Sequence, residues 1–150
     1  MKLTVNLWQA LAAILDSIQP KDHANTGEMR KCAGAVEQIR KVIAPQIDEA
    51  DGIQAEAKKI YEPFQKRLAK LKGDENKLER EELQEEANKK LEKTNEAFRA
   101  MADRFSKEEI EIELDQNYKA YIKDKWEEKL RPAFNFRADA LKVADAFNIE

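Results

Sequence analysis

One long apolar repeat constrains the fold of this chain more than any other feature. Between residues 36 and 71, apolar side chains recur every three or four positions, which is the spacing of one face of an α-helix. The repeat passes through Pro45 and Pro63, where a helix is expected to kink or break. We therefore predict one kinked helix, or two nearly collinear helices, over residues 26–72. The repeat consists of Val36, Ile39, Ile43, Ile47, Ala50, Ile53, Ala57, Ile60, Phe64, Leu68 and Leu71.

A glycine-containing turn at residues 73–76 separates this stretch from a second helical one. Apolar residues recur there in heptad-like steps of three and four through residues 76–105. Two long helices joined by a short turn pair as an antiparallel hairpin, so we expect hairpin arms at about 26–72 and 76–105. The first arm is basic over residues 58–72 and the second is acidic over residues 74–86, and this opposite charge favours the pairing.

Strict alternation marks a different element in residues 109–114, where glutamate alternates with isoleucine or leucine. This pattern favours a strand over the alternative of a helix that begins at Ser106. Residues 2–5 also alternate, and they are the natural partner because an isolated strand cannot satisfy its backbone hydrogen-bonding groups. If the other edge of this strand pairs with a second chain, an Ile112→Pro substitution should abolish that association. The apolar candidates for the interface are Ile110, Ile112 and Leu114.

The remaining segments predict short helices at both ends of the chain. Residues 7–18 form an amphipathic stretch, residues 118–130 form an aromatic one, and a last short helix follows. A chain of 150 residues fits one domain, so the expected fold is mainly α: a single helical domain, 1–150, built on a long kinked hairpin with a small two-stranded patch. The main core is expected at the open end of the hairpin, or completed by another subunit, from Trp8, Phe98, Phe105, Phe134 and Phe136.

The composition excludes most catalytic and metal chemistry. The chain has one histidine, His23, and one cysteine, Cys32, which is expected to be a small buried side chain. No phosphate-binding glycine motif is present, and one histidine with the two serines Ser17 and Ser106 suggests no catalytic triad, so we predict no enzyme activity, cofactor or metal. No apolar run reaches the ~18 residues of a membrane span. The net charge of −3 argues against nucleic acid as the main partner.

Protein partners, including a second copy of the chain, are therefore the expected ligands. Tyr121 is expected to be the exposed ring of the aromatic helix, while Tyr118, Ile122 and Trp126 share a core face. The acidic arm is a second candidate surface, which could mimic nucleic acid toward a host enzyme; its candidate residues are Glu79, Glu82 and Glu86. The basic arm leaves a weak nucleic-acid binder as a third alternative.

The order of these features resembles a known family. Met1–Val5 precedes a short amphipathic helix, and a charged hairpin then closes in the alternating stretch Glu109–Leu114. This arrangement resembles a family of short, uncharacterised helical proteins encoded by tailed bacteriophages and prophages. The resemblance implies a viral origin, a non-enzymatic role in the structure or assembly of the particle, and a location in the host cytoplasm or the virion. It transfers no functional residue to this chain.

Overall fold

The chain folds into two compact units in the computed structural model, which describes residues 1–149. The terminal unit combines the two ends of the sequence, Met1–Pro45 and Phe105–Glu150, and the hairpin unit is Gln46–Arg104. The fold is mainly α with a small sheet, as the sequence predicts. The hairpin expected from residue 26 onward is confined to the second unit, because the first helix of the long repeat belongs to the terminal unit.

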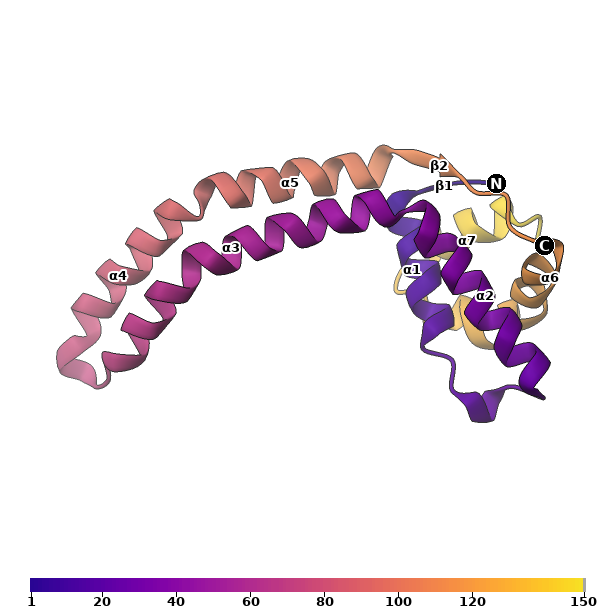
Figure 1. Ribbon diagram of the computed structural model, residues 1–150, viewed down its shortest axis with the longest axis horizontal. Coiled ribbons are helices and arrows are strands. Elements are labelled where there is room, and N and C mark those ends of the chain that lie inside the picture. The colour runs from indigo at the N-terminus through magenta and orange to yellow at the C-terminus, as the bar shows by residue number, and fades with distance from the viewer. Residues whose placement is uncertain (150) are drawn as a thin grey trace. The chain divides into compact units, whose positions relative to one another are not determined.

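The predicted two-stranded patch is confirmed in the terminal unit. Strand β1 (Lys2–Thr4) lies beside β2 (Glu109–Glu111) in Figure 1. The two strands pair antiparallel, with Leu3 opposite Ile110. Beyond β2, the backbone N–H of Ile112 donates to the carbonyl oxygen of Met1 at 3.0 Å. The strand alternative is therefore correct, and a helix does not begin at Ser106.

Helices surround this patch and supply most of the core of the terminal unit. Helix α2 packs on both α1 and α6, and α7 packs on β1. The largest fully buried side chains include Trp8 of α1, Ile39 of α2 and Trp126, which follows α6. The helical elements are α1 (Val5–Asp16), the short turn η1 (Pro20–Asp22), α2 (Thr26–Val42), α6 (Gln116–Lys125), the π-helical turn η3 (Trp126–Leu130), η4 (Arg131–Ala133) and α7 (Arg137–Ala146).

The long repeat breaks into two helices at Ile43. Helix α2 starts with a side-chain cap, in which the N–H of Glu28 donates to Asn25 Oδ1 at 2.9 Å. Helix α3 (Ala44–Lys70) then begins with Pro45 in its first turn, where proline fits because that N–H has no helical acceptor. Pro63, in contrast, lies inside α3 without ending it.

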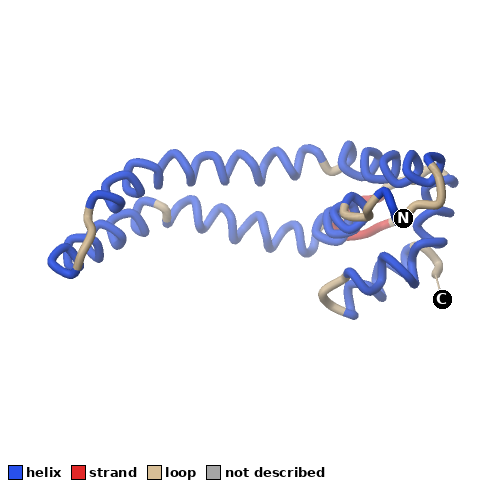
Figure 2. Tube along the Cα trace, turned by 90° about the horizontal axis from the view of Figure 1, so that it is seen from below, coloured by secondary structure: helices blue, strands red, loops and turns tan. Residues whose placement is uncertain are grey.

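The hairpin unit pairs α3 with α4 (Lys77–Lys90) and α5 (Glu92–Lys107), and the two arms lie side by side in Figures 1 and 2. Gly73 adopts φ 92° before the short turn η2 (Asp74–Asn76), a conformation that glycine accepts without a Cβ clash. The arms are joined by an ion pair between Arg104 and Glu49. Their core is a narrow seam formed by Phe64, Leu83 and Ala87, with Tyr61, Leu68 and Leu71 packed against it.

The predicted aromatic core is only partly correct. Trp8 and Phe105 are buried, and Phe134 packs beside Trp126 with ring centroids 5.8 Å apart. Phe98 and Phe136 are instead 46% and 68% exposed. A hairpin of two helices covers only a narrow strip of each, so the Phe98 ring stays at its margin. Phe136 lies in the extended link before α7.

Candidate functional site

The apolar residues predicted as an interface face the interior of the terminal unit. Ile112 and Leu114 are buried and Ile110 is half-buried. The carbonyl oxygen of Ile110 also accepts a hydrogen bond of 2.8 Å from the indole Nε1 of Trp8. These side chains therefore anchor the strand to the core, and they are not available to a second chain.

The outer edge of β2 offers backbone groups instead. In an antiparallel pair, alternate residues direct their N–H and C=O groups toward the partner strand or away from it. Ile112 and Ile110 face β1, because Ile112 exchanges backbone contacts with Met1 and Ile110 lies opposite Leu3. Glu109 and Glu111 therefore direct their N–H and C=O groups outward, and no acceptor for these two N–H groups occurs within residues 1–149.

This geometry corrects the substitution suggested by the sequence. An Ile112→Pro change would remove the N–H that donates to Met1, and would thus break the sheet inside the chain. Glu111 is the suitable position, because its N–H points away from β1.

The acidic arm carries its candidate residues on the surface of the hairpin unit. Glu79, Glu82 and Glu86 are exposed, and they line one shallow hollow together with Arg67 and Lys70. Cations of the first arm therefore lie around the same hollow as these carboxylates, as the charge pattern predicts. These cations partly neutralise the acidic arm, which counts against the hypothesis that this arm mimics nucleic acid.

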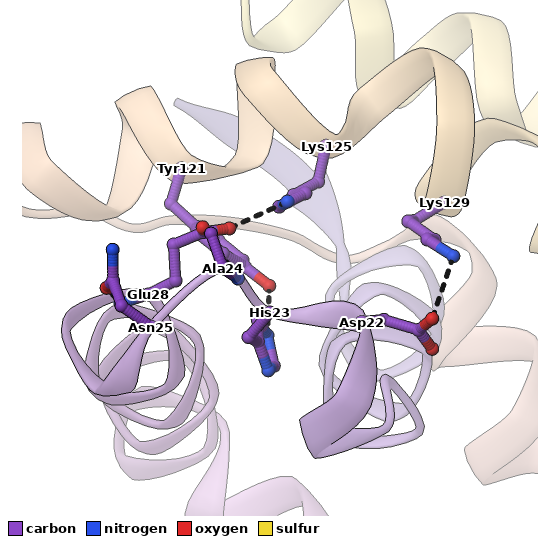
Figure 3. Close-up of polar contacts among 8 residues, drawn as sticks. All are labelled: Asp22, His23, Ala24, Asn25, Glu28, Tyr121, Lys125 and Lys129. Carbon is purple, nitrogen blue, oxygen red and sulfur yellow. Dashed lines mark hydrogen bonds and ion pairs between the residues drawn. The ribbon is translucent and has the colours of Figure 1, made fainter.

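Tyr121 is buried, which makes the prediction of an exposed ring wrong. Its side chain is 4% exposed, and its Oη shares a hydrogen bond of 2.7 Å with His23 Nε2 (Figure 3). Helix α6 packs against α2, and His23 in the link before α2 lies over the Tyr121 ring. Tyr118 is half-buried, and its ring occupies the space that a side chain at Gly34 would fill.

Two ion pairs hold the first turn of α2, and the link that precedes it, against α6 and the π-helical turn. Lys125 Nζ lies 2.7 Å from Glu28 Oε1, and Lys129 Nζ lies 3.3 Å from Asp22 Oδ1 (Figure 3). The hydrogen bond from Lys125 lowers the pKa of the Glu28 carboxyl and raises the pKa of the Lys125 ammonium. Glu28 also accepts from the N–H of Ala24 at 3.0 Å, so the cluster orders the start of α2.

The buried thiol of Cys32 completes this cluster. Cys32 is 5% exposed, as predicted, and its Sγ donates to the carbonyl oxygen of Leu15 at 3.1 Å. Burial raises the pKa of the thiol, so the reactive thiolate is disfavoured. The pKa of Tyr121 is raised mainly by burial and, to a smaller extent, by its hydrogen bond with Cys32. Both groups therefore favour their neutral forms near pH 7.

The raised pKa of Tyr121 predicts a loss of stability in alkali. Above pH ~10 an unfolded tyrosine releases its proton while Tyr121 keeps it, so unfolding becomes easier by up to ~1.4 kcal/mol per pH unit. Urea unfolding at pH 8 and pH 11 should show this decline in the wild type and a smaller one in Tyr121→Phe. Equal declines in the two proteins would contradict the assignment.

The part of the chain that the structure describes contains no cluster of His, Cys, Asp or Glu that could hold a metal ion. Across residues 1–149, none of the helices combines the length and apolar character needed to cross a membrane. The chain matches no family model, no curated protein and no solved structure.

Proposed function

We propose that this protein is a non-enzymatic interaction protein of a tailed bacteriophage that acts in the structure or assembly of the particle. The outer edge of β2 carries the proposal, because Glu109 and Glu111 direct unpaired backbone groups outward within the described part of the chain. An extended segment of a partner can add there as a third strand, with main-chain hydrogen bonds supplying affinity.

The glutamate side chains along this edge determine which kind of partner strand can pair with it. Glu109 and Glu111 are exposed, and Glu113 continues the acidic row. A second copy of β2 would place glutamates beside glutamates, and like charges on neighbouring strands are destabilising. An extended segment with lysine or arginine at alternate positions is therefore a better occupant than a second copy of this chain.

The viral assignment rests on the family resemblance. The two stretches that carry it, Met1–Val5 and Glu109–Leu114, include the two strands β1 and β2. The residues that carry the resemblance are therefore the residues of the small sheet, whose outer edge is the proposed contact surface. The proposal places the protein in the host cytoplasm during assembly or in the finished virion.

The test removes one outward N–H from the edge. Glu111→Pro is expected to weaken capture of virion proteins about tenfold or more in pull-downs from infected cells, because proline cannot donate and its ring obstructs a third strand. Glu111→Ala is the matched control, since it deletes the same carboxylate and keeps the N–H. Circular dichroism of both variants checks that the fold is retained.

Two results would overturn the proposal. The first is that Glu111→Pro captures virion proteins as well as Glu111→Ala does. The second is that the wild type recovers one host enzyme and no virion protein. The second result would move attention to the acidic arm, with Glu79, Glu82 and Glu86 as the positions for charge reversal.

A further inference from the structure

The terminal unit contains a half-open cavity of about 640 Å³ between the π-helical turn η3 and helix α7. This volume falls within the ~300–1,000 Å³ that is typical of small-molecule sites. Helix α7 and residues 131–136 before it supply most of the wall. The apolar lining consists of Trp126, Pro132, Phe134, Ala140, Leu141, Ala144 and Ile149.

Two arginines and one glutamate are the charged residues of the cavity wall. Arg131 forms an ion pair with Glu127 at 3.0 Å, so these two charges offset each other. Arg137, which is exposed, forms no ion pair with any residue in the range 1–149. Among the described residues of the wall, Arg137 therefore carries one positive charge that no ion pair offsets. Arg137 is also the first residue of α7, and Asp139 in the same turn offsets the positive end of the helix dipole, so Arg137 itself is the cationic group of the site.

The backbone beside the cavity is unusual. Trp126 begins a turn of π-helix, a conformation that is rare and occurs often at functional sites. Leu141 lines the cavity and is nevertheless 57% exposed, so part of the apolar wall faces solvent. Exposed apolar surface beside a polar rim is typical of a binding site.

We propose that this cavity binds a small monoanionic amphiphile, namely a carboxylate with an apolar body. The carboxylate pairs with Arg137, and the apolar body lies against Trp126 and Leu141. The single positive charge selects one negative group, and the apolar wall selects the body. This site is separate from the β2 edge and does not depend on the proposed function.

The test uses octanoate as the probe and the two indole N–H signals as reporters in ¹H–¹⁵N NMR spectra. Trp126 lines the cavity, whereas Trp8 is fully buried and its Nε1–H is bonded to Ile110. Octanoate should shift the Trp126 signal saturably, with a Kd on the order of 0.1–1 mM, and leave the Trp8 signal in place. Octylammonium, which has the same chain and the opposite charge, should not saturate the site.

Three variants locate the interaction. Arg137→Gln should weaken octanoate binding about tenfold, because it removes the charged partner. Ala144→Phe should abolish binding by filling the cavity. Lys142→Gln is the matched control, since it removes one positive charge from the same helix at an exposed residue outside the cavity wall.

The proposal is overturned if octylammonium binds as well as octanoate, or if Arg137→Gln and Lys142→Gln bind octanoate equally. It is also overturned if octanoate shifts neither indole signal, as expected of a cavity that only accepts a side chain of a partner protein.

Discussion

Replacing Trp8 by alanine is expected to lower the free energy of unfolding of the terminal unit by about 3–5 kcal/mol. The side chain is fully buried, and its ring packs edge-on against Phe147 with centroids 6.3 Å apart. Its Nε1–H also donates to the carbonyl oxygen of Ile110 in β2. The substitution therefore leaves a cavity and also removes this hydrogen bond to β2. Small domains are stable by only ~5–15 kcal/mol, so a change of this size removes a large share of the total.

The measurement is urea unfolding followed by circular dichroism at 222 nm. Trp8→Phe keeps an aromatic ring and removes the N–H, and it should cost about 1–3 kcal/mol because the Ile110 carbonyl loses a donor. The difference between the two variants then measures packing. A loss below about 1 kcal/mol in Trp8→Ala would contradict the central position of this side chain.

Replacing Phe64 by alanine is expected to destabilise the hairpin unit by about 3 kcal/mol or more. Phe64 is 5% exposed and packs with Leu83 and Ala87 in a seam that has few other large side chains. Lys90 Nζ also lies 5.4 Å from the centre of its ring. The seam has few other apolar contacts that could replace those of Phe64. We therefore expect α3 and α4 to open locally more often.

Phe98→Ala is the matched control, because Phe98 lies in the same unit and its side chain is 46% exposed. It should change stability by no more than about 0.5 kcal/mol. Amide hydrogen exchange in α3 and α4 separates the two cases, because only Phe64→Ala should accelerate exchange there. Similar rates in both variants would show that the seam does not hold the arms together.

The sheet could be predicted from the sequence because alternation at a period of two is a direct property of strands. Residues 109–114 and 2–5 each carry that period, and no other segment offers a partner. The direction of the backbone groups could not be predicted. It depends on the register that sets Leu3 opposite Ile110, and side-chain alternation does not reveal which N–H groups face outward.

The cavity and the buried Tyr121 could not be predicted either. Tyr118, Ile122 and Trp126 have the spacing of an ordinary helix, and nothing in that spacing indicates the π-helical turn that starts at Trp126. Tyr121 is buried because residues of the preceding link, including His23, cover it from a distant part of the chain. Such contacts leave no periodic signal.

The order in which the chain is synthesised affects how it folds. Met1 bonds to a residue 111 positions later, so β1 emerges long before its partner strand exists. During that interval α1 exposes the Trp8 face that the finished unit buries. The hairpin unit contains contacts at much shorter range, such as the hydrogen bond between Tyr61 and Gln84, 23 residues apart, so it can fold first. By joining Glu49 to Arg104, it shortens the loop that β1 and β2 must close. We therefore expect the hairpin to form before the two ends of the chain pair.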